Sequence, residues 1–344
     1  MTVEAHVDKE QPPIRWGILG AGRIARTFTE DLLLLADQVP VAVGSRSSGR
    51  AQRFAADYGM EKSYGSYAAL AADDSLDVVY VATPHSEHYD AARVCLEAGR
   101  AVLVEKPFTV TAAETAQLIA LATSKKLFAM EAMWTRFNPI VREVTELVHD
   151  GGIGRVTAVQ IDLAGAPDYD PAGRLWNPAL AGGALLDMGV YPLSFGSMLL
   201  GPPDAIRAVA TPALTGVDAN TAVIARYPGG AVGLYHCGLW ARSPQVATII
   251  GTRGTIIVGS PTGAAFYKPD SYTLIPADGG EPRTREIALH GTGFTYEAAE
   301  VARCLRAGLT ESPLMSLAGT LEVMRVLDAA RAASGSIDAQ HGVK

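Results

Sequence analysis

The sequence predicts an α/β protein with a doubly wound parallel sheet in its first half and strand hairpins in its second half. Residues 14–19 form a short apolar run that leads directly into a glycine-rich turn and a helix ending near residue 36. Continuous apolar runs then alternate with helices as far as residue 132, which is typical of parallel strands covered on both faces. Beyond residue 200, turns such as 228–230 separate strand-like runs, which indicates hairpins.

The remaining elements follow from periodicity and from their flanking glycines and prolines. In the first half we expect strands at 39–44, 77–83, 101–104 and 127–132, with helices at 48–58, 66–72, 89–98 and 112–125. In the second half we expect helices at 138–150, 294–307 and 317–333 and strands at 155–163, 205–210, 220–227, 231–240, 245–251 and 254–258, with edge strands at 272–275 and 283–289.

The composition is that of an ordinary soluble globular chain with room for two domains: 344 residues, 48% hydrophobic and 19% charged. The net charge, 29 − 36 = −7, and the lack of a basic block argue against a nucleic-acid partner. No apolar run approaches the roughly 20 residues of a membrane span, so we expect no membrane. Three widely spaced cysteines predict neither a disulfide framework nor a zinc site and fit a reducing cytoplasm.

Residues 20–25 read GAGRIA and match the G-x-G-x-x-A pattern of dinucleotide-binding turns. Gly20 permits the tight turn, and Gly22 lets the backbone approach a pyrophosphate. Arg23 and Ile24 open the following helix, whose N-terminus faces the phosphates. The alternative is a glycine-rich turn without a ligand, but the strand before the turn and the helix after it favour cofactor binding.

The end of the second strand predicts NADP(H) rather than NAD. A chain that uses NAD normally carries Asp or Glu there to hold the ribose 2′-hydroxyl. This chain has Ser45, Arg46 and Ser47 instead. Arg46 can pair with a 2′-phosphate, to which the serines can donate hydrogen bonds. The alternative is that Arg46 is a solvated loop cation.

Two later strands end in polar residues, and ligands bind at the carboxyl ends of parallel strands. Thr83, Pro84 and His88 follow the first of them and are predicted to contact the cofactor. His85 and His88 are three residues apart, but no third ligand lies nearby in the sequence, so we predict no metal. Either histidine can instead contact substrate or cap a helix.

The strand at 101–104 runs into Glu105 and Lys106, which therefore point at the same cleft. We predict that both contact the cofactor and that Lys106 also serves catalysis. A solvated lysine is the alternative.

Asp187 and Tyr191 lie four residues apart in the apolar stretch 182–200. On a helix they point the same way, so they predict one wall of an active site. Pro192 lacks an N–H and can kink this helix.

Taken together, these motifs resemble the glucose–fructose oxidoreductase/inositol dehydrogenase (Gfo/Idh/MocA) family. They are GAGRIA at 20–25, EKP at 105–107 and GGALLDMGVY at 182–191. The segment MEAMWTRF at 130–137 is similar to the branch with dimeric dihydrodiol dehydrogenase and NADP-dependent D-xylose dehydrogenase. The resemblance implies a Rossmann domain followed by an α/β domain with a large, mostly antiparallel sheet. It covers residues from about 14 to 335.

The resemblance also implies site residues and an assembly. Lys106, Asp187 and Tyr191 would be catalytic, and the open face of the large sheet would join copies into a homodimer or homotetramer. We add Trp134 and Arg136, where the chain leaves the first sheet, to the cofactor contacts. The predicted substrate contacts are Phe137, Trp176, Asp187 and Tyr296. An ordinary surface loop is the alternative for Trp176, and packing or capping is the alternative for Tyr296.

We therefore expect a disordered tail at 1–13, an NADP-binding Rossmann domain at 14–136 and a substrate-binding and dimerisation domain at 137–344. The expected activity is NADP-dependent interconversion of a secondary alcohol of a sugar, cyclitol or cyclic diol with its ketone or lactone. Two alternatives remain: an NADP-sensing regulatory protein without catalysis, and an NAD-dependent glycosidase. The individual substrate is not predicted.

In the expected mechanism Tyr191 is the acid/base. A phenol has an ordinary pKa near 10, which is too high for an efficient base at neutral pH. We expect Lys106 to lower the pKa of Tyr191, because a nearby cation favours phenolate. Asp187 is expected to bind a substrate hydroxyl, to orient Lys106, or both.

Overall fold

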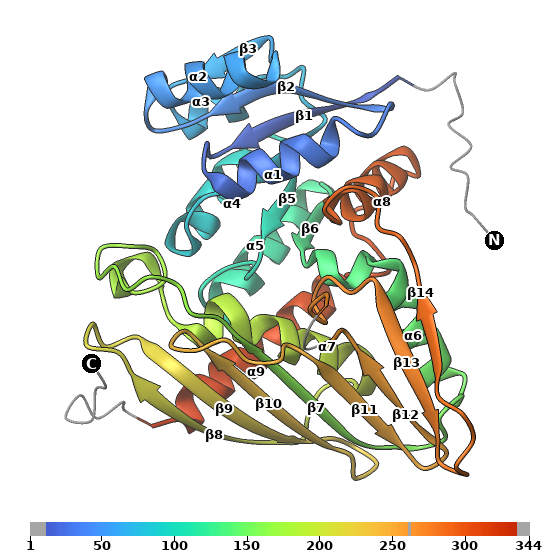
Figure 1. The fold of residues 1–344 in the computed structure, drawn as a ribbon. Helices are drawn as coiled ribbons and strands as arrows, with labels where there is room; N and C mark the ends of the chain where they lie inside the picture. Colours follow the sequence, from blue (N-terminus) through green and yellow to red (C-terminus); the bar gives the residue numbers. More distant parts are fainter. Residues whose placement is uncertain (1–11, 261–262, 336–344) are drawn as a thin grey trace.

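The first of two sheets is parallel and six-stranded in the computed structural model, which describes residues 12–260 and 263–335 (Figure 1). Its order, β3-β2-β1-β4-β5-β6, is that of a doubly wound nucleotide-binding fold, as predicted. The strands are β1 (Ile14–Leu19), β2 (Gln38–Gly44), β3 (Lys62–Tyr64), β4 (Val78–Val81), β5 (Ala101–Glu105) and β6 (Ala129–Ala132). The helices are α1 (Arg23–Leu32), α2 (Ser48–Tyr58), α3 (Tyr67–Ala71), the short η1 (His85–Glu87), α4 (His88–Glu97) and α5 (Ala112–Lys125).

Gly20 makes the tight turn between β1 and α1 possible. Its φ is +114°, and a Cβ there would stand 2.5 Å from the carbonyl oxygen of Ala82. Both facts exclude a larger residue. The turn therefore lies directly against the end of β4 and directs the N-terminus of α1 at the carboxyl edge of the sheet.

The second sheet has eight strands in the order β14-β13-β12-β11-β7-β10-β9-β8. Among the described strands of this second sheet, only β7 and β10 pair in parallel. The predicted mostly antiparallel sheet is therefore confirmed. The strands are β7 (Val156–Ala164), β8 (Ala205–Pro212), β9 (Asp218–Arg226), β10 (Val232–Gly238), β11 (Ala247–Gly251), β12 (Gly254–Val258), β13 (Ser271–Pro276) and β14 (Arg283–Glu286).

Helices cover one face of this second sheet, and the other face carries exposed apolar side chains (Figure 1). Along β9, buried and exposed residues alternate with the period of two that a half-covered sheet requires. The helices on this face are α6 (Pro139–His149), α7 (Val190–Leu200) and α9 (Leu317–Ala333). The second half also contains α8 (Phe294–Arg306) and the short turns η2 (Trp134–Phe137) and η3 (Pro178–Leu180).

The predicted helix around Asp187 begins as a wide π turn, η4 (Leu185–Gly189), and continues as α7. Pro192 accounts for this, because it has no N–H for the carbonyl four residues earlier. Contrary to our interpretation of the sequence, Pro178–Leu200 is long and apolar enough to cross a membrane. However, 83% of its most apolar window is buried inside the fold, as in a core helix.

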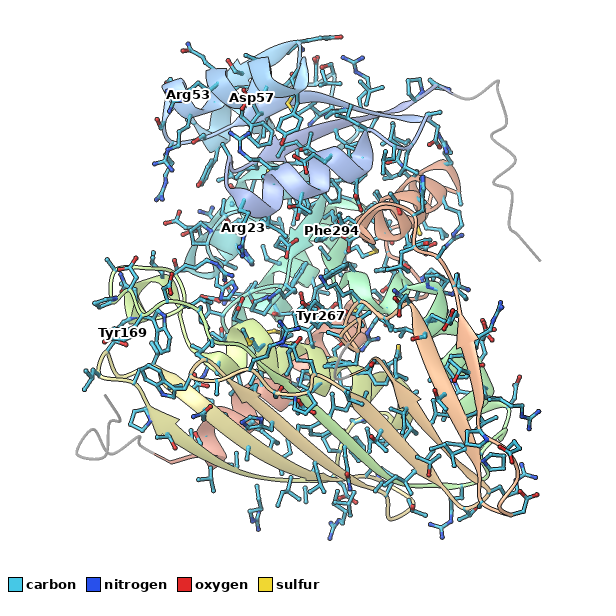
Figure 2. The ribbon with its side chains drawn as sticks, in the orientation of Figure 1. Arg23, Arg53, Asp57, Tyr169, Tyr267 and Phe294 are labelled. Carbon is cyan, nitrogen blue, oxygen red and sulfur yellow. The ribbon has the colours of Figure 1, made fainter. Side chains whose placement is uncertain are left out.

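The last helices return to the first sheet, so the division at residue 136 is not a clean separation in space. Helix α8 packs against α1, and α9 packs against α5. Figure 2 shows Arg23, Phe294 and Tyr267 in the zone between the two sheets. The expected tail lies outside the described residues except for Pro12 and Pro13.

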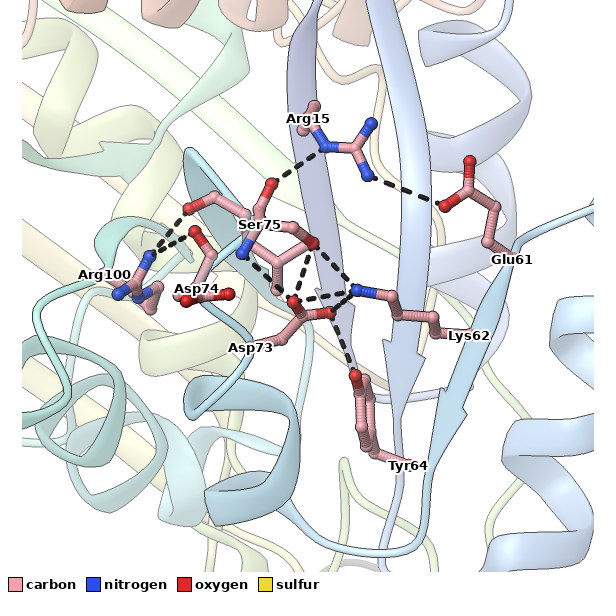
Figure 3. Close-up of polar contacts among 9 residues, drawn as sticks. Arg15, Glu61, Lys62, Tyr64, Asp73, Asp74, Ser75 and Arg100 are labelled. Carbon is pink, nitrogen blue, oxygen red and sulfur yellow. Dashed lines mark hydrogen bonds and ion pairs between the residues drawn. The ribbon is translucent and has the colours of Figure 1, made fainter.

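A polar network closes the outer edge of the first sheet (Figure 3). The carboxylate of Asp73 accepts hydrogen bonds from Lys62 Nζ, Tyr64 Oη and Ser75 Oγ over 2.7–3.0 Å. Ser75 also accepts a hydrogen bond at its carbonyl from Arg15 of β1. These contacts tie the short edge strand β3 to the loop before β4.

Candidate active site

A buried carboxylate joins the two halves of the chain. Asp187 lies in the π turn η4, and its Oδ1 accepts hydrogen bonds from Lys106 Nζ at 3.1 Å and from Arg174 Nη1 at 2.9 Å. Lys106 Nζ also donates to the backbone carbonyl of Asp187 at 2.7 Å. Because Lys106 directly follows β5, this set links the carboxyl edge of the first sheet to the helix layer of the second. We call Lys106, Arg174 and Asp187 the ionic set.

Electrostatics keep Asp187 ionised. Burial alone would raise the pKa of Asp187, but the charges of Lys106 and Arg174 lower it well below its usual range. The side chain of Asp187 is 8% exposed and that of Lys106 is 12% exposed, so water screens their interaction weakly. Asp187 therefore holds the side chain of Lys106 in one orientation. Orienting Lys106 is one of the two roles that we expected of Asp187.

Two glycines allow Arg174 to reach the site from its loop. A Cβ on Gly182 would stand 2.6 Å from the carbonyl oxygen of Leu175, and Gly183 has a φ of +120°. The backbone just before η4 can therefore lie against the segment that carries Arg174. This contact is the structural reason for the glycine pair ahead of Asp187.

His85 is buried beside the ionic set. Its Nε2 lies 3.6 Å from Asp187 Oδ1, and its Nδ1 lies 3.2 Å from the carbonyl oxygen of Ala181. Burial lowers the pKa of His85 to about 3, so the ring is neutral at pH 7 and donates from Nδ1 to that carbonyl. Within the described parts of the chain, no group of three His, Cys, Asp or Glu side chains could hold a metal ion.

The phenol of Tyr191 faces the same lysine as Asp187, so the two predicted wall residues do share a face. Lys106 Nζ lies 4.7 Å from the centre of the Tyr191 ring, and Trp134 Nε1 donates to Tyr191 Oη at 2.9 Å. Burial, followed by the charge of Glu105, raises the pKa of Tyr191 well above its usual value. Our expectation that Lys106 lowers this pKa is wrong for the protein without cofactor, because the ammonium bonds Asp187 and faces the ring rather than the phenol oxygen.

The turn after β1 fits the phosphates of a dinucleotide. Gly22 precedes α1, makes no side-chain cap, and has open space where a Cβ would stand. Gly22 therefore leaves the first N–H groups of α1, those of Arg23 and Ile24, without a side-chain cap. These N–H groups can bind an anion. The Oγ1 atom of Thr83 is buried at the end of β4 and, within the described residues, has no hydrogen-bond partner.

The end of β2 presents a cation. Arg46 is 64% exposed at its side chain and pairs with Glu87 of η1 at 2.9 Å. Ser45 is buried and accepts a hydrogen bond from the backbone N–H of Ser47. An exposed ion pair of this kind is weak, so Arg46 can exchange Glu87 for a phosphate at little cost.

Other predicted cofactor residues hold the loops around the cleft. His88 places its two ring nitrogens 2.8 Å from the carbonyl oxygen of Pro107 and 3.0 Å from that of Thr83. Burial lowers the pKa of His88 to about 4. Glu105 is buried and accepts hydrogen bonds from Tyr80 Oη and from the backbone N–H of Lys106. Direct contact of these residues with a cofactor stays a prediction.

Arg136 and Phe137 lie differently from what we expected. Arg136 donates from Nε and Nη2 to the hydroxyl and carbonyl of Ser194 at 3.0 and 3.1 Å, so it braces α7 from inside the protein. Phe137 is 3% exposed and belongs to the core. Both side chains help to pack the two halves together, and their contact with cofactor or substrate stays a prediction.

Tyr296 takes a packing role, an alternative left open by the sequence, whereas Trp176 is buried rather than part of an ordinary surface loop. Trp176 is 1% exposed, packs edge-to-face against Tyr169 and tilted against Trp240, and donates to the carbonyl of Asp168. The Oη of Tyr296 accepts a hydrogen bond from the backbone of the loop before α8.

Sequence reasoning missed Tyr267 as a site residue and gave Arg174 and Phe294 no defined role there. The ring of Tyr267 lies 5.2 Å from that of Tyr191, and Phe294 stacks on Trp134 at 4.5 Å. Tyr267 also lines a cavity of about 590 Å³ between the loops that follow β10, β12 and β14. No periodic or motif signal marks these residues, because only the long-range fold brings them to Tyr191.

Known proteins match both halves of the chain. An oxidoreductase family with an NAD-binding Rossmann fold matches residues 14–133, and a GFO/IDH/MocA C-terminal domain matches residues 141–257. The chain is 37% identical over 333 residues to trans-1,2-dihydrobenzene-1,2-diol dehydrogenase of Mus musculus, covering 94% of this chain and 97% of that one. It is 36% identical over 360 residues to D-xylose 1-dehydrogenase (NADP(+)) of Hypocrea jecorina, covering 92% and 91%.

Among solved structures, a 3-ketoreductase from Actinomadura kijaniata in complex with NADP and TDP-benzene is similar over the whole fold. The TM-score is 0.82 at 25% sequence identity, and the match covers 93% of this chain and 98% of that one.

The ionic set makes a prediction about stability. Asp187→Asn should lower the free energy of unfolding by about 3 kcal/mol at pH 7, because it leaves the largely buried ammonium of Lys106 without its counter-charge. The pKa of Asp187 is lower in the folded chain than in the unfolded chain, so its contribution is complete above pH ~4 and is lost as the pH falls. The free energies of unfolding of wild type and Asp187→Asn should therefore differ by about 1 kcal/mol less at pH 3 than at pH 6. Urea unfolding at each pH measures it, and a constant difference would contradict this account.

Proposed function

The chain belongs to the Gfo/Idh/MocA oxidoreductase family, and we propose that it is an NADP-dependent dehydrogenase. Its reaction interconverts a secondary alcohol of a sugar, cyclitol or cyclic diol with the ketone or lactone. The observation that carries this proposal is the arrangement of Asp187 and Tyr191 around one buried lysine, Lys106. The names of two relatives at 36–37% identity, a diol dehydrogenase and a D-xylose dehydrogenase, support the substrate class.

Tyr191 exchanges a proton with the reacting hydroxyl. NADP, when bound, supplies the acceptor for the hydride in the oxidising direction. With its raised pKa, Tyr191 is protonated at neutral pH, which suits the acid that protonates a developing alkoxide. In the oxidising direction the phenol must first lose its proton, so oxidation should accelerate as the pH rises.

Lys106 holds the reacting oxygen. Its ammonium lies between Asp187 and the face of the Tyr191 ring, where it can also donate to a substrate oxygen. Its ammonium can donate to the oxygen on which negative charge develops, in a site that water screens poorly.

The cofactor specificity that we propose is for NADP over NAD. The uncapped N-terminus of α1 and the unpartnered hydroxyl of Thr83 would hold the phosphates and the nearby ribose or amide groups. Arg46 would bind the 2′-phosphate, because the end of β2 has no carboxylate of its own to hold a free 2′-hydroxyl.

The assembly that we propose is a homodimer or homotetramer through the open face of the second sheet. Val209 is 73% exposed there, Ile224 is 52% exposed and Leu234 is 39% exposed, on three adjacent strands. Apolar side chains clustered on one sheet face favour contact with a second copy.

Tyr191→Phe tests the acid/base role. Turnover should fall by about 100-fold or more while the Kd for NADP changes little, because the variant loses only the proton-transferring hydroxyl. Tyr272→Phe removes a phenol hydroxyl that bonds Glu143 far from the site and serves as the control. The assay follows reduced-nicotinamide absorbance with aldoses, cyclitols and dihydrodiols.

Other outcomes of the same assay separate the competing functions. A Tyr191→Phe variant as active as wild type would contradict the mechanism. Tight NADP binding without turnover of any alcohol would indicate a sensor, and glycoside cleavage without net cofactor change would indicate a glycosidase.

Arg46→Ala tests cofactor recognition. The Kd for NADP should rise about tenfold or more, the loss expected for a charge-assisted contact, while the Kd for NAD changes less than about twofold. Arg93→Ala, which removes an exposed arginine of α4, should change neither constant. Calorimetric titration measures both, and equal losses for the two cofactors would remove Arg46 from 2′-phosphate recognition.

Charge on the open sheet face tests the assembly. The double variant Ile224→Lys/Leu234→Lys should be a monomer in light scattering where the wild type is a dimer or tetramer, because buried lysines oppose association. Leu33→Lys places the same charge at an exposed apolar residue after α1 and should leave the assembly unchanged. A monomeric wild type at micromolar concentration would contradict the proposal.

A further inference from the structure

The hydrogen bond between Trp134 and Tyr191 has only one possible direction. An indole N–H can donate but cannot accept, so Tyr191 Oη is the acceptor at 2.9 Å. The phenol proton must therefore point away from Trp134. Lys106 Nζ donates hydrogen bonds to the carbonyl and the carboxylate of Asp187 and lies over the ring of Tyr191. Trp134 is thus the hydrogen-bond donor to the phenol oxygen in the described protein.

This donor acts against the other influences on the phenol. Burial and the charge of Glu105 raise the pKa of Tyr191, whereas the hydrogen bond from Trp134 lowers it. A hydrogen bond to the charged form of a group favours that form. The indole N–H therefore stabilises the phenolate by a direct hydrogen bond to its oxygen.

Packing fixes the position of the indole. Trp134 stacks on Phe294 with ring centres 4.5 Å apart and an angle of 11° between the rings. Gly293 has a φ of +114°, and a Cβ there would stand 3.0 Å from Cζ3 of Trp134. Glycine at this position lets the start of α8 lie flat against the indole.

The start of α8 is itself held from the first sheet. Helix α8 has no side-chain cap from its own N-cap residue, Gly293. Asp31 of α1 takes this role: its carboxylate accepts hydrogen bonds at 2.8 Å from the backbone N–H groups of Thr292 and Phe294. Asp31 is 2% exposed, so loss of these donors would leave a buried charge unpaired.

A continuous line of contacts therefore runs from α1, the helix that begins at the phosphate-binding turn, to the phenol. We propose that Trp134 is a positioning residue whose indole N–H orients the Tyr191 hydroxyl toward substrate, and that Asp31, acting through Phe294, holds the indole at that distance. The proposal rests on the proposed acid/base role of Tyr191 and adds the residues that make this phenol competent.

Two replacements of Trp134 remove its N–H and disturb the surrounding packing to different extents. Trp134→Phe removes the N–H and part of the ring, whereas benzothienylalanine at position 134 puts sulfur in place of the N–H and keeps the ring size. Both should lower kcat for alcohol oxidation about 10- to 100-fold, the size expected for a hydrogen bond to a charged group, with KM changed less than about threefold. The rise of kcat with pH should move about one unit to higher pH, because the phenolate loses its donor.

A double-mutant cycle separates positioning from general damage to the fold. In a Tyr191→Phe background, the change at Trp134 should have no further effect on residual turnover, because no phenol oxygen remains to accept the hydrogen bond. The proposal is overturned if benzothienylalanine leaves kcat and the pH profile unchanged, or if its effect is the same in both backgrounds. Full activity of Tyr191→Phe alone would instead overturn the proposed mechanism, and this inference with it.

A matched pair of aspartates tests the second half of the proposal. Asp31→Ala should reduce kcat and move the pH profile in the same direction as the change at Trp134. Asp37→Ala removes the ion pair between Asp37, which follows α1, and Arg306 at the far end of α8 from Trp134. This variant should leave the pH profile unchanged. An unchanged profile in Asp31→Ala, or equal shifts in both variants, would exclude a specific role for Asp31.

Discussion

The interaction of Asp187 with Lys106 and Arg174 is the constraint on which the site depends. Its members come from the end of β5, from the loop after β7 and from the π turn before α7. A buried carboxylate needs its cations, because an unpaired charge in the interior is costly. These contacts therefore stabilise the arrangement of the two sheets in which Lys106 lies between Asp187 and the ring of Tyr191. The glycine pair at 182–183 and the wide π turn are the local features that allow this approach.

Two sets of contacts with different chemistry converge on the catalytic pair. The ionic set fixes Lys106 through charge, and an aromatic set of Trp134, Phe294 and Tyr267 fixes Tyr191 through packing and one hydrogen bond. They meet where the ammonium lies 4.7 Å from the phenol ring centre. The pKa of the phenol stays raised beside this lysine because burial and the charge of Glu105 outweigh the hydrogen bond from Trp134, which lowers the pKa.

The parts of the site that could be predicted from sequence depend on local geometry. Three such features are the strand that runs into Lys106, the glycine turn at Gly20 and the four-residue spacing from Asp187 to Tyr191. Each of them depends on only a few neighbouring residues, so the sequence alone indicates its structure. Asp31 and Tyr267 could not be found this way, because only the long-range fold brings them to the site. Arg136, Phe137 and Trp176 show that a conspicuous side chain near a motif can also be needed for packing. The pKa of Tyr191 was mispredicted because it depends on burial, which a spacing does not reveal.

The most direct test of the central claim follows the hydrogen that leaves the alcohol carbon. The alcohol with the highest rate, carrying deuterium at its carbinol carbon, is incubated with enzyme and NADP, and the reduced cofactor is analysed by NMR. Direct transfer within the site around Lys106 and Tyr191 predicts one deuterium at C4 of the nicotinamide, on one face of the ring. Reduced cofactor that contains hydrogen from solvent, or NADP that binds without being reduced by any alcohol, would contradict the account.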